Sequence, residues 1–337
     1  MTGQAVFDAG DVTLQSGMVL PDVKLVYRTH GQLNAARDNA IVYPTHYMGN
    51  HDSNAWAIAP GLALDPERYF IIIPNMLGNG VSSSPSNTPA PFDGPRFPLV
   101  TVRDNVLLQH RLVTEVFGLT TLALVTGHSM GALQTFQWGA LFPGMVQRIA
   151  PFCGAARVSR HNWLFLEGCK SALMADASFA GGDYAAPPVT GIRAFAHVYA
   201  GWAWSQTFFR QELDREKLGM PSMDAFLTLA WEPFFQAHDA NNLLAMLATW
   251  QAADISADPR FDGDFAKALA AITAKAMVMP CQSDLYFPPE DSAIEVAHMP
   301  QAELRVIPSL WGHMAGGGMN PDDMAYINAG LTDILAR

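Results

Sequence analysis

Gly127-His-Ser-Met-Gly131 decides the fold, because it joins a strand-like run to a helix-like run through a very short turn. The run before it, Leu122-Ala-Leu-Val-Thr126, predicts a buried strand, and residues 132–141 predict a buried helix. In a G-x-S-x-G turn the serine sits on a strained bend, and the glycines let the strand and the helix pass close to each other. This context predicts that Ser129 is a nucleophile.

A nucleophilic serine needs a histidine base, and in this arrangement the acid and then the histidine follow the serine in the chain. Four histidines lie well downstream of Ser129. His313 follows a strand-like run at 304–307 and sits in a turn, where such a base is expected. Helical stretches, or a helix end before a proline, explain the other three: His197, His238 and His298. We therefore predict His313 as the base.

The acid should hold the histidine in one tautomer and stabilise its positive charge. Residues 275–281 predict a buried strand, and Asp284 follows at its carboxyl end, the edge where open α/β sheets collect their chemistry. Glu290 and Asp291 are nearby rivals, but they follow Pro288-Pro289 and are typical of the first turn of a helix. We predict Asp284 as the acid, although a turn or helix-cap role would explain it too.

An oxyanion hole should combine the N–H of the residue after the nucleophile with one from a loop after an earlier strand. The first donor is Met130. The second is expected from residues 45–50, which follow the strand-like run 39–43. Tyr47 is the first choice there, with Met48 next.

These motifs stand within longer stretches that match a known family. The stretches are residues 64–78, 97–104, 127–131, 155–159, 181–184 and 283–289. On them, the chain resembles the homoserine O-acetyltransferase branch of the α/β-hydrolases over most of its length. The resemblance implies an acyl-enzyme on Ser129, a triad completed by Asp284 and His313, and acyl transfer from a thioester to an alcohol.

The chain departs from that family around the substrate. The catalytic histidine is usually followed by an aspartate that helps to hold the amino-acid acceptor, but here Met314 follows it. The residue before the nucleophile is usually glycine in the acetyltransferases, but here it is His128, as in many esterases. The tail at 315–318, Ala-Gly-Gly-Gly, also differs from the usual hydrophobic sequel. Met48, His128 and Met314 are candidate substrate-pocket residues, and a methionine cannot pair with the ammonium group of homoserine as the usual aspartate can.

The order of elements predicts an α/β-hydrolase fold with a mostly parallel, doubly wound sheet. Strand-like runs alternate with helical stretches, except for an antiparallel edge before Asn39. Between 157 and 265 the strand signal vanishes and aromatic, helical sequence takes over. We predict that 1–156 and 266–337 form the core, and that 157–265 form an inserted helical lid whose aromatics partly line an entrance over Ser129. The resemblance implies a homodimer formed through this lid.

Bulk properties are typical of a soluble enzyme. The 337 residues carry a formal net charge of −11, which argues against nucleic acid and anionic membranes as partners. The apolar stretches are too short for a transmembrane helix, and the N-terminus does not resemble a signal peptide. Three cysteines suggest no disulfide framework and favour a reducing cytoplasm. His46, His51 and Asp52 lack the spacing of a metal site, so no metal and no resident cofactor are expected.

Three functions fit these residues. The first is a serine hydrolase that cleaves a small ester or thioester through an acyl-enzyme, and His128 and Met314 favour it. The second is an O-acyltransferase that moves an acetyl-type group from acyl-CoA, as co-substrate, to a small alcohol such as homoserine. The third is a silent binding protein, which an intact triad argues against. The first is the prediction and the second is its main alternative.

Overall fold

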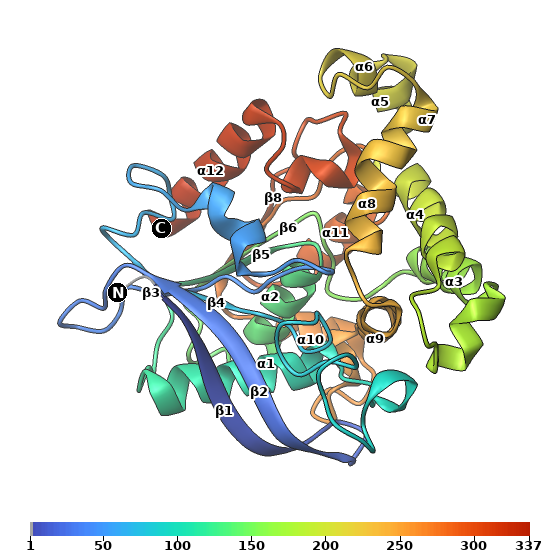
Figure 1. Ribbon diagram of the computed structural model, residues 1–337. Helices are drawn as coiled ribbons and strands as arrows, with labels where there is room; N and C mark the ends of the chain where they lie inside the picture. Colours follow the sequence, from blue (N-terminus) through green and yellow to red (C-terminus); the bar gives the residue numbers. More distant parts are fainter. Residues whose placement is uncertain (1–2) are drawn as a thin grey trace.

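The computed structural model describes residues 3–337, and within them the strands form one sheet of eight (Figure 1). The strand order is β1-β2-β4-β3-β5-β6-β7-β8, and β1 and β2 form the antiparallel edge while β3 to β8 run parallel. The strands are β1 (Gly3–Thr13), β2 (Val19–His30), β3 (Ala40–Val42), β4 (Phe70–Pro74), β5 (Leu124–His128), β6 (Arg148–Phe152), β7 (Lys275–Val278) and β8 (Ala302–Leu304). The predicted α/β architecture with its antiparallel edge is confirmed.

The central strands are buried on both faces, which explains their unbroken apolar sequences. Every residue of β4 is buried, as is every residue of β3 and β5. Helices α1 and α2 pack together on one side of the sheet, and α12 contacts β6 and β7 on the other (Figure 1). The core helices are α1 (Val102–Arg111), α2 (Met130–Leu141), α10 (Phe265–Ala270), α11 (Pro289–Val296) and α12 (Pro321–Leu335).

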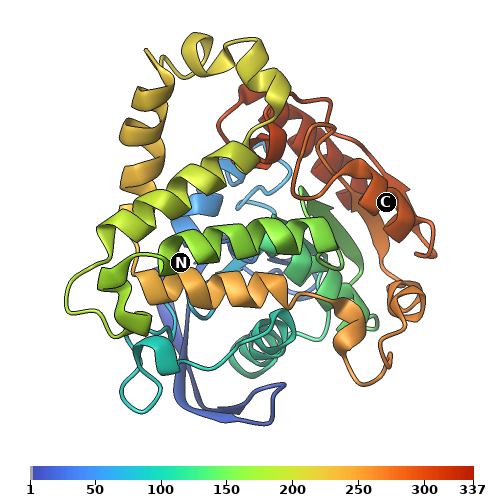
Figure 2. The same cartoon turned by 90° about the vertical axis from the view of Figure 1, so that its right-hand side faces the viewer.

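A group of helices occupies the chain between β6 and β7, where the lid is predicted. Figure 2 shows its longest members, α3, α4 and α9, lying side by side across one flank of the molecule. The helices of this predicted lid, called the lid helices below, are α3 (Arg160–Met174), α4 (Val189–Ala203), α5 (Gln206–Arg210), α6 (Leu213–Glu216), α7 (Met223–Phe226), α8 (Glu232–Gln236) and α9 (Ala240–Gln251). Among residues 3–337, no helix is both long and apolar enough to cross a membrane.

Candidate active site

The nucleophile elbow has the predicted strand–turn–helix form. Ser129 stands between β5 and α2 with φ 56° and ψ −121°, a backbone conformation that side chains rarely adopt. The amide of Ser129 donates a hydrogen bond to Phe152 O on the neighbouring strand, at 3.1 Å. A Cβ on Gly131 would lie 2.7 Å from the Pro44 carbonyl oxygen, so only glycine lets the helix start this close to the sheet. The surrounding structure thus holds a strained serine in place.

The structure brings together the three residues predicted as a triad. His313 Nε2 lies 2.8 Å from Ser129 Oγ, and His313 Nδ1 lies 2.8 Å from Asp284 Oδ2. All three side chains are buried. In this geometry, His313 can accept the serine proton while the carboxylate of Asp284 holds the ring and faces the positive charge that forms.

Asp284 is fixed by the chain that follows it. Its Oδ1 accepts hydrogen bonds from the amides of Tyr286 and Phe287, at 2.7 and 3.3 Å. This leaves Oδ2 for His313. The predicted rivals Glu290 and Asp291 lie instead in the first turn of α11.

The loop that carries His313 is fixed by serines that the sequence analysis missed. Ser283 Oγ donates to the carbonyl of Ser309 at 2.7 Å and accepts from the amide of Gly312 at 3.1 Å. Ser309 Oγ in turn donates to Asp323 Oδ2 at 2.8 Å. These contacts tie the end of β7 to the loop after β8. Serines next to the acid and base were the available signal, but serine is too common in turns to single out.

The predicted oxyanion donors lie on the two expected loops. Met130 begins α2, and Tyr47 lies in the loop after β3. Among the residues that the structure describes, no acceptor takes a hydrogen bond from either backbone N–H. The Tyr47 hydroxyl donates to the carbonyl of Leu243 in α9 at 2.9 Å, which anchors this loop under the lid. The neighbouring Met48 is buried with φ 52°.

A cavity of about 460 Å³ leads from the surface to Ser129 and His313. The segment predicted as the lid supplies about half of its lining, including most of the aromatic rings of the walls, as the sequence analysis expected for part of the lid aromatics. The wall rings are Tyr199, Trp204, Phe226, Trp231 and Phe234, with Tyr47 from the core. The candidate pocket residues His128 and Met314 also line it, whereas Met48 does not. Of the described residues that line the cavity, none is Lys, Arg, Asp or Glu.

Two further histidines beside the triad are held neutral. Burial lowers the pKa of His46 to about 4, despite a backbone hydrogen bond that opposes the shift. Burial, together with the charge of a protonated His313, holds the pKa of His128 well below its usual range. The His46 ring lies 5.3 Å from that of His128, which lies 4.8 Å from that of His313. Near neutral pH, therefore, neither His46 nor His128 adds a positive charge to the cavity floor.

The remaining histidines lie away from the triad. His197 in α4 makes a hydrogen bond of 2.8 Å with Glu232 in α8, and His298 makes one with Ile294 O in α11. His238 stacks edge-on against Phe234. Within residues 3–337, no cluster of three or more His, Cys, Asp or Glu side chains could hold a metal ion.

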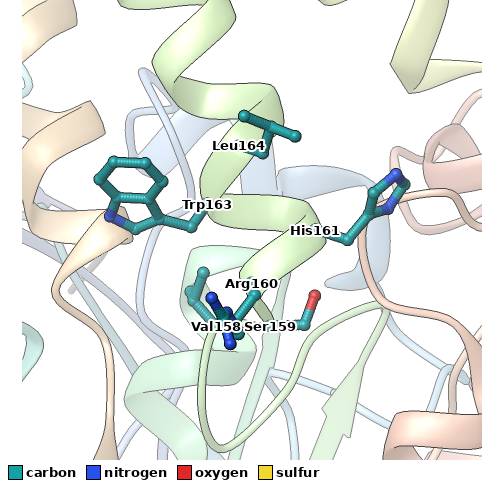
Figure 3. Close-up of a pocket in the computed structure, with 6 residues that line it drawn as sticks. All are labelled: Val158, Ser159, Arg160, His161, Trp163 and Leu164. Atoms are coloured by element: carbon teal, nitrogen blue, oxygen red, sulfur yellow. The ribbon is translucent and has the colours of Figure 1, made fainter.

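A second hollow, of about 560 Å³, lies on the outer side of the lid at the start of α3. Figure 3 shows His161, Trp163 and Leu164 projecting from this helix around it, above Val158, Ser159 and Arg160. Trp163 and Leu164 are 44% and 64% exposed. Because this hollow contains none of the triad residues, it is separate from the candidate active site.

Comparison with known proteins places this geometry in a family. Residues 40–316 match the family described as the alpha/beta hydrolase fold. The ethyl acetate hydrolase of Pseudomonas veronii is 38% identical, over 98% of this chain and 95% of that protein. The homoserine O-acetyltransferase of Chlorobium chlorochromatii is 30% identical, over 89% and 87%.

A solved structure of the acetyl esterase MekB superposes with a TM-score of 0.97 at 38% identity, covering 99% of this chain and 97% of that one. Esterases of this superfamily and homoserine O-acetyltransferases are therefore both relatives of the chain. The chain is an enzyme that belongs to the α/β-hydrolase family, in its homoserine O-acetyltransferase-like branch.

Proposed function

We propose that the enzyme hydrolyses small carboxylic esters through an acyl-enzyme on Ser129. The observation that carries this proposal is the pair of 2.8 Å contacts joining Ser129 to His313 and His313 to Asp284. The ethyl acetate hydrolase and acetyl esterase relatives, each 38% identical, support an ester as the substrate.

The proposed first half-reaction forms the acyl-enzyme. Ser129 Oγ attacks the ester carbonyl carbon and gives its proton to His313 Nε2, while Asp284 stabilises the resulting imidazolium. The carbonyl oxygen becomes an oxyanion and accepts hydrogen bonds from the backbone N–H groups of Tyr47 and Met130. When the C–O bond breaks, the imidazolium returns its proton to the leaving alkoxide, which departs as an alcohol.

The second half-reaction repeats these steps with water as the nucleophile. His313 takes a proton from water as it attacks the acyl carbon, and then returns the proton to Ser129 Oγ as the carboxylic acid leaves. Every step uses groups of this chain, so the proposal calls for no resident cofactor and no metal.

The alternative is O-acyl transfer from acyl-CoA to a small alcohol, which the 30% identical homoserine O-acetyltransferase favours. Two features argue for water instead. Among the described residues that line the cavity, there is no Lys or Arg to meet an anionic acyl-CoA. Met314, next to the proposed base, offers a thioether that cannot pair with the ammonium group of homoserine.

The test is hydrolysis of ethyl acetate by the wild type and by Ser129→Ala. We expect acetate release by the wild type only, and an enzyme mass raised by one acetyl group during turnover. Acetyl-CoA, with and without homoserine, tests the alternative through thiol release and the O-acetyl product. Turnover by the alanine variant at the wild-type rate would refute the nucleophile, and efficient homoserine acetylation would establish the alternative.

We further propose that the enzyme works in the cytoplasm, binds a small acyl substrate rather than nucleic acid or membrane, and forms a homodimer. All three cysteines are buried free thiols, which suits a reducing compartment. The net charge of −11 disfavours polyanionic partners. For the dimer, the exposed apolar side chains of Trp163 and Leu164 on the lid provide contact area (Figure 3).

A further inference from the structure

The cavity over Ser129 is far larger than a two-carbon group requires. Its volume of about 460 Å³ falls within the range of roughly 300–1,000 Å³ typical of sites that enclose drug-sized ligands. Ser129 lies at its floor with 2% exposure, while Phe234 and Met319 at its wall are each 46% exposed. A substrate would therefore reach the nucleophile past Phe234 of the lid and Met319 of the core.

The walls of the cavity are mostly apolar. Aromatic rings and the aliphatic side chains of Leu218, Met220 and Ala230 dominate the lining. Its polar members are the serine and histidine groups of the floor, Ser53, the indole N–H groups of two tryptophans, and tyrosines of which Tyr47 already donates a hydrogen bond to the lid. A charged group in this cavity would lose its water without gaining a partner of opposite charge, which is strongly unfavourable.

We propose that the lid cavity binds the hydrocarbon part of an uncharged ester that is several carbons longer than ethyl acetate. This inference rests on the proposed ester hydrolysis and specifies its substrate class. Each methylene moved from water into the apolar wall contributes about 0.8 kcal/mol, so kcat/KM should rise about fourfold per added carbon until the cavity is full.

Two substrate series test this, one extending the alcohol and one the acyl group. We would measure kcat/KM for ethyl, butyl and hexyl acetate, and for ethyl acetate, butanoate and hexanoate. The charged controls are monoethyl succinate, matched to ethyl butanoate, and 4-acetoxybutanoate, matched to butyl acetate. We expect kcat/KM to rise with chain length in at least one series. We also expect kcat/KM to be about a hundredfold lower for each carboxylate ester than for its neutral partner.

If ethyl acetate is hydrolysed but neither series rises, this inference is overturned while the proposed function stands. If kcat/KM for the carboxylate esters is within tenfold of the value for their neutral partners, the inference is overturned as well. Failure to hydrolyse any ester would instead remove the proposed function on which it rests.

An independent observation concerns His128. Its ring is stacked between two others: it lies 4.8 Å from His313 with 29° between the planes, and 5.7 Å from Phe152 with 22°. Its Nε2 lies 3.4 Å from the backbone oxygen of His313, a contact in which a neutral ring protonated at Nε2 would donate. His128 thus contacts both the ring and the backbone of the proposed base.

The chain after His313 leaves space for this ring only because residue 316 is glycine. A Cβ on Gly316 would lie 2.2 Å from His128 Cδ2 and 2.6 Å from its Nε2. These distances are far below any real contact between such atoms, and the His128 ring is buried between the rings of Phe152 and His313 with little room to shift. His128 and Gly316 therefore form one steric unit.

We infer that His128 is a positioning residue, which holds the His313 loop and presents a neutral aromatic face to the imidazolium that forms during catalysis. The other titratable groups facing His313 are Asp284, at 2.8 Å, and Tyr286, whose ring lies 4.4 Å away. His46 lies behind His128. Burial raises the pKa of Tyr286 and lowers that of His46, so both groups are neutral near neutral pH.

Four variants test this role, with kcat and KM measured as functions of pH. His128→Phe keeps the aromatic face, and His128→Leu removes it. We expect the acid limb of the kcat/KM profile to move to lower pH by about half a unit in the leucine variant only, because the imidazolium loses its π contact. Both variants should lower kcat rather than raise KM, since the loop loses its hydrogen bond.

Gly316→Ala should lower kcat by about a hundredfold through the clash with His128. The double variant with Gly316→Ala and His128→Ala should have a kcat at least tenfold higher than that of Gly316→Ala alone. If the phenylalanine and leucine variants share one pH profile, His128 is only a filler and the inference fails. Absence of recovery in the double variant would refute the steric unit.

Discussion

Because of Glu295 in α11, the free energy of unfolding of the protein should fall as the pH rises. Its side chain is buried, with the residue 2% exposed, and Oε1 accepts a hydrogen bond from the amide of Ala156 at 2.6 Å. Among residues 3–337, Oε2 has no hydrogen-bond partner. Burial raises the pKa of Glu295 from 4.5 to about 8, so the folded protein keeps this carboxyl neutral at neutral pH.

The direction of the effect follows from proton binding. Between pH 4.5 and about 8 the unfolded chain has released this proton, while the folded protein still holds it. Raising the pH therefore favours unfolding throughout this interval, and the contribution is constant outside it. At 1.36 kcal/mol per pKa unit, the loss amounts to about 5 kcal/mol between the two ends.

Glu295→Gln tests this, because the amide stays neutral at every pH and its oxygen can still accept from Ala156. We would measure the free energy of unfolding in urea at about pH 5, 7 and 9. Relative to the wild type, the variant should gain about 4 kcal/mol of stability as the pH rises from 5 to about 8, and the difference should level off above that. Glu290→Gln on the same helix, where the carboxyl is exposed, is the matched control and should show no such trend. A pH-independent difference between Glu295→Gln and the wild type would refute the reasoning.

Three further substitutions have clear expected outcomes. Asp284→Asn should lower kcat by about 10⁴-fold with little change in KM, as the loss of tautomer control requires; steady-state kinetics showing less than a tenfold fall would contradict the role. Ser283→Ala removes the contacts to Ser309 and Gly312 and should lower kcat about tenfold, with ester hydrolysis again the assay. Leu164→Glu should convert a dimer to a monomer in sedimentation velocity while ester hydrolysis persists; an unchanged sedimentation coefficient would exclude this lid surface as the interface.

The sequence was most informative where chemistry and local backbone geometry coincide. The turn around Ser129 needs glycine on both sides, so its strand–turn–helix form could be read from a single stretch. The placement of Asp284 and His313 after successive strands followed from the parallel sheet, because the carboxyl ends of parallel strands meet at one edge. The structure brings these residues into hydrogen-bond contact, at the distances expected of a triad.

Side-chain contacts across long stretches of chain could not be predicted in the same way. Which lid aromatics line the cavity depends on how α4, α7 and α8 pack over the sheet. Trp204 and Trp231 line the cavity, while Trp163 lines the separate hollow at the start of α3. The burial of Glu295 could not be predicted either, because nothing in the local sequence distinguishes a buried glutamate in an amphipathic helix from an exposed one such as Glu290.

Two positions at which the chain departs from the acetyltransferases are far apart in sequence but adjacent in the structure. His128 stands before the nucleophile and Gly316 lies in the altered tail after the base, yet the ring of one fills the space that a Cβ on the other would occupy. Replacing His128 alone with a smaller residue would leave a void beside His313. Replacing Gly316 alone with a larger residue would cause a clash there. A conversion from hydrolase toward transferase would thus have to change both positions together, along with Met314, whose thioether faces the cavity where an acceptor alcohol would bind.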